Sequence, residues 1–364
     1  MRVVIAPDSF KGTASAADAA AALATGWRSV RPGDDLVERP MADGGEGTLD
    51  AFASSVPGAR RIPITVQGPV TTAVETSWLL LPDGTGVVEL AATSGITLLD
   101  PLEPLDAHSV GFGEAIAAAL DAGVERLLLG LGGSASSDGG AGALAVLGAW
   151  FLDDSGAPVP LGNRGLGLID RVDLSGLRPL PHGGAVILGD VTNPLLGPLG
   201  AAAIFGLQKG ADAATIDVLE ANLARLADLM PERVQPLAAE PGAGAAGGAG
   251  FGLLAWGAEM GGGAALVAQA VGLADAIAGA DLVITGEGRF DGQSEAGKAP
   301  TVVAGIARDA GVPTALVAGA ITAEPRGFAA SVALAVLAGG GSAAMAEPLR
   351  WLEAAGAELA RARG

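Results

Sequence analysis

Cysteine is absent from this 364-residue chain, and histidine and lysine are scarce. Without cysteine the chain has no disulfides, no thiolate zinc ligands and no cysteine nucleophile. The two histidines, His108 and His182, lie far apart in the sequence, which argues against a serine–histidine–aspartate hydrolase. Of the 21 cationic residues only three are lysines, Lys11, Lys209 and Lys298, and each lies next to a glycine. Because a compact ammonium on a flexible stem suits phosphate, we expect Lys11 and Lys298 to bind phosphate; the indication for Lys209 is weaker.

Positive charge is scarce overall, since the formal net charge is −19. A chain this acidic repels a phosphate backbone, so we expect no nucleic-acid partner. The apolar run at the N-terminus ends at Pro7, too early for a signal peptide, and no run of about 18 apolar residues without a glycine break follows. We therefore expect a soluble cytoplasmic protein that makes no membrane contact.

The length predicts about two domains, at roughly 150 residues for each. Strand–loop–helix units occur near both ends of the chain, whereas residues 61–90 contain hairpin signals. This pattern predicts an α/β protein with a doubly wound, Rossmann-like parallel-sheet domain built from both termini and an inserted mixed α/β domain. We expect the first domain to comprise 1–60, 91–140 and 261–364, the second to comprise 61–90 and 141–260, and the active site to lie in the cleft between them.

Individual elements follow from hydrophobic periodicity and turn residues. Strands are predicted at 2–6, 36–39, 62–66, 74–81, 87–90, 126–131, 185–188, 281–285, 313–318 and 332–337. Helices are predicted at about 16–29, 113–122, 213–229, 301–309 and from 343 to the end, with a short helix from 49. The glycine–alanine segment 242–250 is predicted to be a loop, a hinge, or backbone pressed against another part of the chain.

A glycine-rich loop follows the predicted strand at 126–131. Residues 130–135 fit the dinucleotide pattern G-x-G-x-x-[GA], with Asp153 and Asp154 about twenty residues further on. The glycines continue through 136–142, however, where a nucleotide-binding helix would already have begun. We favour a longer phosphate cradle of backbone amides and serine hydroxyls over a dinucleotide loop, with a purely structural turn as the remaining alternative.

A second glycine-rich segment, 292–299, nearly matches the P-loop pattern G-x-x-x-x-G-K-[ST]. Ala299 lacks the hydroxyl that binds Mg²⁺, and Pro300 follows at once, so we do not interpret it as a P-loop. Lys298 could still meet a phosphate at the start of the next helix.

Four acidic loops complete the inventory, at 7–11, 42–48, 189–194 and 285–291, and three of them follow a predicted strand directly. Ligands of open α/β sheets bind beyond the carboxyl ends of the strands. Phosphoryl transfer needs cations on the phosphates, carboxylates on Mg²⁺ and a carboxylate near the attacking hydroxyl, and these loops supply such groups. The alternative is that their aspartates and glycines only form turns and helix caps.

These motifs together resemble the type I bacterial glycerate kinases. The resemblance is carried, in order, by residues 4–11, 42–48, 132–140, 190–195, 205–210, 241–248 and 284–291. Ser136 and Ser137 replace a threonine and an asparagine expected in that family, Leu207 replaces a proline, and Phe290 replaces a leucine or methionine. None of these changes removes a charged group.

The resemblance implies ATP-dependent phosphorylation of D-glycerate with Mg²⁺ on a two-domain α/β fold, with 2-phosphoglycerate as the usual product. The residues themselves do not distinguish the 2- from the 3-hydroxyl. The partners are then two small molecules, D-glycerate and ATP, and the chain would act as a monomer or a homodimer.

Roles for individual residues follow from this resemblance as hypotheses. As catalytic groups we expect Asp190 or Asp43 to accept the glycerate hydroxyl proton and Lys11 to neutralise phosphate charge. ATP phosphates are expected on Gly132, Gly133, Ser134, Ser136, Ser137 and Lys298. Glycerate is expected on Gly44, Gly45, Asn193 and Arg289, whose planar guanidinium suits a carboxylate. The candidate Mg²⁺ ligands are Asp8, Asp138, Glu287 and Asp291.

Two other classes of function remain open at this level. An NAD-dependent hydroxy-acid dehydrogenase would need a clean nucleotide loop, which the continuing glycines at 139 and 140 interrupt. A non-catalytic binding protein for small anions would leave the many loop carboxylates unexplained.

Overall fold

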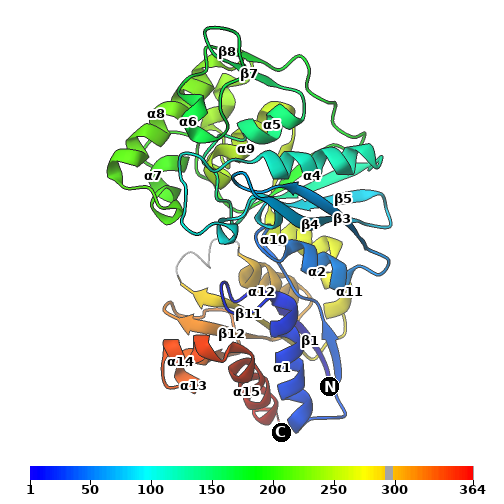
Figure 1. Cartoon of the computed structure of the whole chain (residues 1–364). Helices are drawn as coiled ribbons and strands as arrows, with labels where there is room; N and C mark the ends of the chain where they lie inside the picture. Colours follow the sequence, from blue (N-terminus) through cyan, green and yellow to red (C-terminus); the bar gives the residue numbers. More distant parts are fainter. Residues whose placement is uncertain (292–297, 364) are drawn as a thin grey trace. The chain divides into compact units, whose positions relative to one another are not determined.

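The chain folds into two compact α/β units (Figure 1). The computed structural model describes residues 1–291 and 298–363. The first unit comprises 1–43, 47–57 and 262–364, and the second comprises 44–46 and 58–261. The predicted mixed α/β class, with one Rossmann-like parallel sheet and one mixed sheet, is confirmed.

The first unit contains a five-stranded sheet in the order β13-β12-β11-β1-β2, and every neighbouring pair is parallel. Its strands are β1 (Arg2–Pro7), β2 (Asp35–Glu38), β11 (Leu282–Phe290), β12 (Thr314–Ile321) and β13 (Ala330–Ala333). Its helices are α1 (Ala16–Val30), α2 (Thr48–Ser55), α10 (Gly263–Ala270), α11 (Leu273–Ile277), α12 (Ala299–Asp309), α13 (Leu334–Leu337), α14 (Gly341–Ala346) and α15 (Pro348–Arg361).

Helix α1 begins where the sequence predicts because Ser15 caps it, its hydroxyl accepting a hydrogen bond from the Asp18 N–H at 3.1 Å. Its alanine-rich face and Trp27 are buried in a core shared with β1, β11, β12 and α15. Helices α1 and α15 pack side by side, whereas α12 packs against α10 and α11 (Figure 1). The sheet is therefore wound in two directions, as the alternation of strands and helices predicts.

The second unit contains a six-stranded mixed sheet in the order β10-β9-β6-β5-β4-β3. The pairs β3–β4 and β4–β5 are antiparallel, and the other three pairs are parallel. Its strands are β3 (Arg60–Gln67), β4 (Ala73–Leu80), β5 (Thr85–Glu89), β6 (Arg126–Gly130), β9 (Ala185–Leu188) and β10 (Glu259–Gly261), and β7 (Trp150–Leu152) and β8 (Arg171–Asp173) form a separate pair.

The α-helices of this unit are α3 (Ala91–Ser94), α4 (Val110–Asp121), α5 (Ala141–Val146), α6 (Gly162–Leu166), α7 (Ala201–Phe205), α8 (Ala213–Leu229) and α9 (Ala245–Trp256). Three 3₁₀ turns, η1 (Ile96–Leu98), η2 (Leu207–Lys209) and η3 (Gln235–Ala239), complete it. None of the helices within 1–291 and 298–363 is long and apolar enough to cross a membrane.

The division differs from the sequence-based expectation at residues 91–140, which lie in the second unit. The reason is that β6 pairs with β5 and β9, and α4 packs on α5 and β3. A parallel strand carries no sequence signal for which of two sheets it joins, so the return of the α/β pattern at 91–140 was assigned to the wrong sheet.

For segment 242–250 the structure bears out backbone pressed against another part of the chain, because Cβ atoms on Gly247 and Gly248 would lie within 3 Å of other residues. Helix α9 starts within this segment and bends at three residues with positive φ, Ala246, Gly247 and Gly248. Two other local predictions are corrected. Only the first part of 332–337 is a strand, and helix α13 follows it immediately. The C-terminal helix is divided into α14 and α15, and Pro348 takes the first position of α15, where its missing N–H costs nothing.

Candidate functional site

The two directions of winding in the first unit meet between β1 and β11. From β1 the chain continues through α1 to β2 on one side, and from β11 it continues through α12 to β12 on the other. Adjacent strands whose connections leave in opposite directions form a topological switch point, where α/β proteins bind ligands at the carboxyl ends of the strands. Asp8 follows β1 directly, and Glu287 lies in the carboxyl half of β11.

A cavity of about 460 Å³ opens at this switch point. It is lined by every charged residue of the first unit that the sequence singles out, namely Asp8, Lys11, Asp43, Glu287, Arg289, Asp291 and Lys298. Its other wall is apolar or small, and includes Gly319 and Ala320 of β12, Leu334, Ala344 and Met345. Charged groups on one side and an apolar wall on the other are typical of a small-molecule site.

The carboxylates in this cavity repel one another. Asp8 is 5% exposed, and its carboxylate accepts a hydrogen bond from the Ser9 N–H at 2.7 Å. Burial, followed by the negative charges of Asp43 and Glu287, raises the pKa of Asp8 to about 8, although Ser9 and Lys11 oppose the shift. Asp8 therefore holds a proton at neutral pH, or gives it up when a cation arrives.

Lys11 is the cation nearest to these carboxylates. Its Nζ lies 3.5 Å from Oδ2 of Asp43, and its side chain is two-thirds exposed. The charge of Asp43 raises the pKa of Lys11 most strongly, and Asp8 and Glu287 add to this against the effect of burial. Lys11 is thus a charged, largely exposed side chain in the lining of the cavity.

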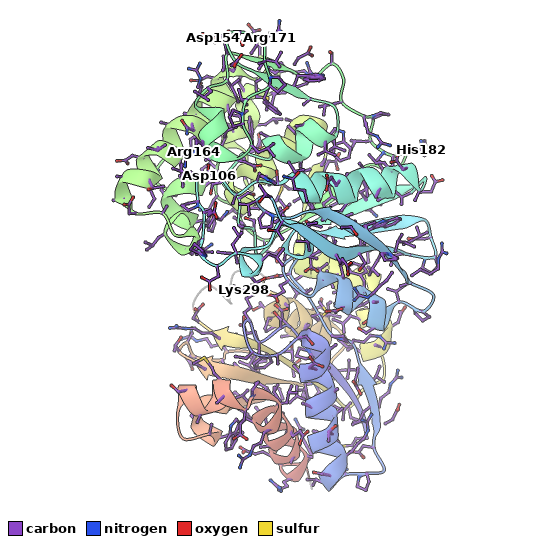
Figure 2. The ribbon with its side chains drawn as sticks, viewed as in Figure 1. Asp106, Asp154, Arg164, Arg171, His182 and Lys298 are labelled. Atoms are coloured by element: carbon purple, nitrogen blue, oxygen red, sulfur yellow. The ribbon has the colours of Figure 1, made fainter. Side chains whose placement is uncertain are left out.

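Arg289 and Lys298 supply the other positive charges of the cavity. Nε of Arg289 lies 3.7 Å from Oδ2 of Asp291, a loose contact on a side chain that is 68% exposed. Lys298 directly precedes α12, with Pro300 in the first turn of that helix. Figure 2 labels Lys298. The near-match to a P-loop at 292–299 lies outside the described residues except for its last two positions.

Within the residues that the structure describes, no group of three or more histidine, aspartate or glutamate side chains is arranged to hold a metal. Mg²⁺ usually takes only one or two protein carboxylates and completes its shell with water and substrate phosphates. Asp8 and Glu287, both buried at the same cavity and mutually repulsive, fit such a partial ligand set.

In the second unit, the glycine-rich loop after β6 is organised by Asp138, which is fully buried. Its Oδ2 accepts hydrogen bonds from the N–H and hydroxyl of Ser109, both at 2.8 Å, and from the Gly142 N–H at 3.2 Å, while Oδ1 accepts from the Gly140 N–H at 3.1 Å. Four donors satisfy this carboxylate, so it fixes the loop against the start of α4.

The rest of the loop only partly resembles the predicted phosphate cradle of backbone amides and serine hydroxyls. The amides of Gly132, Ala135 and Gly139 donate to carbonyls of the protein itself, those of Gly44, Ser94 and Gly247. Ser136 and Ser137 are buried, whereas Gly132 and Gly133 reach the surface. The outer edge of the loop is therefore formed by the surface glycines Gly132 and Gly133 and by the adjoining Ser134, a residue that is 6% exposed.

The expected glycerate ligands Gly44 and Gly45 pack against this loop. Gly44 has a φ of +94°, and a Cβ there would lie 2.2 Å from the Leu188 carbonyl oxygen. A Cβ on Gly132 would lie 2.4 Å from Cα of Gly45. Only glycine permits this backbone contact, so both residues hold the loop edge in place.

Asp190 and Asn193 follow β9 in the same unit. Asp190 is half-buried two residues after the strand ends. The side-chain amide of Asn193 donates to the Leu199 carbonyl at 2.7 Å, and the backbone carbonyl of Asn193 accepts a hydrogen bond from the Gly244 N–H. Asn193 thus stabilises the turn that follows Asp190.

Sequence reasoning missed Ser109 and indicated Lys209 only weakly. Ser109 supplies two of the four hydrogen bonds to Asp138 but has no motif of its own. Lys209 is 3% exposed and contacts the loop, with its Nζ 2.8 Å from the Ser134 hydroxyl oxygen. The scarcity of lysine and the neighbouring glycine are the sequence signals that point to it.

Comparison with known proteins places these features in one family. Residues 3–363 match the Glycerate kinase family. The chain is 44% identical over 330 residues to a "Glycerate kinase" of Bacillus subtilis strain 168, covering 89% of this chain and 86% of the relative. It is 42% identical over 328 residues to a "Glycerate 2-kinase" of Escherichia coli K12, covering 88% and 86%.

A solved structure agrees with this. The protein named "putative glycerate kinase 2 from Salmonella typhimurium LT2" superposes with a TM-score of 0.84 at 38% identity, covering all of this chain and 98% of the other. A match over almost the full length, with the charged cavity at its switch point, leads to one conclusion: this chain belongs to the glycerate kinase family.

Proposed function

We propose that this protein transfers the γ-phosphoryl group of ATP to a hydroxyl of D-glycerate, giving 2-phosphoglycerate. The observation that carries the proposal is the switch-point cavity, where carboxylates and lysines converge without cysteine or histidine. Phosphoryl transfer depends on positioning and charge neutralisation and needs no covalent nucleophile from the protein. Relatives named glycerate kinase and glycerate 2-kinase supply the substrate and the 2-hydroxyl. ATP as the donor favours a cytoplasmic location.

Asp8 and Glu287 are the residues that would hold Mg²⁺, with Asp291 nearby at the cavity wall. The ion would neutralise charge that develops on the phosphate oxygens. The raised pKa of Asp8 supports this assignment, since a carboxylate that resists ionisation beside like charges is stabilised by a divalent cation. We leave Asp138 out of this set because four protein donors already satisfy its carboxylate.

Lys11 and Lys298 would bind phosphate oxygens, because both line the cavity and both are flexible point charges. Arg289 would bind the glycerate carboxylate. It lines the cavity, and its planar guanidinium matches the geometry of a carboxylate.

Asp43 is our candidate for the group that accepts the glycerate hydroxyl proton. It lines the same cavity and lies 3.5 Å from Lys11, whose positive charge would hold a phosphate close to it. Asp190 is the competing candidate because it follows the carboxyl end of β9. The two assignments are separated by the Asp→Asn variants described in the Discussion.

The direct test is to incubate the purified protein with ATP, Mg²⁺ and D-glycerate and to identify the product by ³¹P and ¹³C NMR. We expect phosphorus coupled to carbon 2 of glycerate. Coupling to carbon 3 would keep the kinase and overturn the regiochemistry. Turnover of another hydroxy acid, with none of glycerate, would contradict the substrate. Binding of glycerate without ATP consumption would favour an anion-binding protein instead.

A further inference from the structure

Lys209 is a buried ammonium held by neutral acceptors. It ends η2 and is 3% exposed. Its Nζ donates to the Ser134 hydroxyl oxygen at 2.8 Å and to the Ser136 carbonyl oxygen at 2.5 Å, and both acceptors belong to the glycine-rich loop. Neither acceptor carries a charge, so this lysine is bound by the loop without being neutralised by it.

Burial dominates the electrostatics of Lys209. It lowers the pKa of the ammonium to about 7, and the negative charge of Asp138 opposes this shift. The Asp138 carboxylate is itself shared among four donors from Ser109, Gly140 and Gly142. An anion arriving at the loop would therefore supply charge that the site lacks, and would favour the protonated lysine.

The hydrogen bond from Lys209 also orients Ser134. A hydroxyl carries one proton, so when its oxygen accepts from Nζ, that proton remains for a different acceptor. The Ser134 hydroxyl belongs to the outer edge of the loop, next to the exposed Gly133. The donor it retains is thus available to a bound molecule.

The bend in α9 makes room for this arrangement. Gly247 has a φ of +68°, and its carbonyl accepts the Gly139 N–H at 3.1 Å. A Cβ at this position would lie 2.1 Å from the Ser136 carbonyl oxygen and 2.8 Å from Nζ of Lys209. The glycines of segment 242–250 therefore permit the lysine and the loop to meet.

We propose that Lys209 is a positioning residue that holds the Ser134 hydroxyl as a hydrogen-bond donor to an anionic oxygen of a bound substrate at the edge formed by Gly132, Gly133 and Ser134. The inference rests on the proposed function, in which the anionic oxygens come from an ATP phosphate or from the glycerate carboxylate. Separate titrations with each molecule distinguish these two sources.

The test uses four variants of the full chain: Lys209→Met, Ser134→Ala, the double variant that combines them, and the control Gln208→Met. The control changes the exposed neighbour of Lys209 on η2. Calorimetric titration with Mg²⁺–ATP and with D-glycerate, each in two buffers of different ionisation enthalpy at pH 7.5, gives affinity and proton uptake. KM for each substrate and kcat are measured alongside.

We expect Lys209→Met and Ser134→Ala to weaken binding of the same single substrate by about tenfold or more, with the other substrate and kcat much less affected. Proton uptake on binding that substrate should be smaller in Lys209→Met than in the wild type, and Gln208→Met should match the wild type. The double variant should bind no more weakly than Lys209→Met alone, since both changes remove one contact.

Wild-type affinity of Ser134→Ala for both substrates would overturn the proposal, as would proton uptake in Lys209→Met equal to that of the wild type. If Lys209→Met fails to fold, Ser134→Ala still decides by its affinities. Failure of the proposed function is separately visible, because the wild type would then bind a ligand with the expected proton uptake yet form no phosphoglycerate.

Discussion

Asp8 and Asp138 are both buried aspartates, one in each unit, and their surroundings differ. Asp138 is fully buried and accepts four hydrogen bonds from backbone and hydroxyl donors. Asp8 is 5% exposed, accepts one such bond, from Ser9, and faces the negative charges of Asp43 and Glu287. The protein's own donors satisfy the Asp138 carboxylate, which stabilises the loop. The Asp8 carboxylate accepts fewer such bonds, so a proton or a cation has to balance its charge, as is common for groups in reactive sites.

The largest effect is expected from removing divalent metal, which should abolish turnover at the Asp8 cavity but leave the loop around Asp138 folded. If Asp8 and Glu287 hold Mg²⁺ as proposed, a chelator should lower glycerate phosphorylation by about a thousandfold or more. Added Mg²⁺ should restore it. The loop around Asp138 needs no metal, so the free energy of unfolding should change by less than about 1 kcal/mol. Full turnover in the chelator would contradict this assignment of the cavity.

Asp138→Asn should damage the scaffold directly. The amide N–H₂ of the new asparagine would face backbone N–H groups that now donate hydrogen bonds to the Asp138 carboxylate. We therefore expect the free energy of unfolding to fall by about 3 kcal/mol or more. Urea unfolding followed by circular dichroism measures it. Unchanged stability would mean that the loop does not depend on this carboxylate.

Asp8→Asn should change the free energy of unfolding less than Asp138→Asn does, and should raise it. Between about pH 4 and pH 8 the unfolded chain has lost the Asp8 proton while the folded chain keeps it, so wild-type stability falls as pH rises. The Asn variant lacks this penalty and can still accept from Ser9. We expect it to match the wild type near pH 4 and to exceed it at pH 8 by at least about 1.4 kcal/mol, the equivalent of one pKa unit.

Thermal unfolding across this pH range, without metal, makes the comparison. A constant difference between Asp8→Asn and the wild type at every pH would show that Asp8 titrates as an ordinary aspartate.

The smallest effect is expected at the surface. Asp106 accepts two hydrogen bonds from Arg164, each at 2.7 Å, but both side chains are exposed (Figure 2). Solvent screens such a pair, so Asp106→Asn should shift the midpoint of thermal unfolding by less than about 2 °C. Asp106→Asn is the matched control for Asp138→Asn. A comparable loss of stability in both variants would contradict the distinction between buried and exposed carboxylates.

The sequence predicts the charged half of the cavity well, for a physical reason. The carboxyl ends of parallel strands lie at the same edge of a sheet. The sequence therefore predicts that Asp8 and Glu287, which lie at or near the ends of two such strands, are close together. Strand β11 runs further than predicted, to Phe290, because the segment Gly286-Glu287-Gly288, which resembles a turn, pairs with β12.

The scaffold was much less predictable. The sequence identifies Asp138 only as a candidate Mg²⁺ ligand, because it does not indicate that Ser109, 29 residues away, donates to this carboxylate. Lys209 reaches Ser134 across 75 residues, and no local pattern encodes that contact. Long-range hydrogen bonds of this kind become visible only when the chain is folded.

The central claim is that the switch-point cavity carries the chemistry, and Asp43→Asn tests it most directly. Turnover and the free energy of unfolding should be measured on the same preparation, with Asp190→Asn beside it. We predict that Asp43→Asn lowers kcat by about 10²- to 10⁴-fold, the usual contribution of a general base, with stability nearly unchanged. Wild-type turnover in Asp43→Asn, with the loss appearing in Asp190→Asn instead, would contradict the assignment.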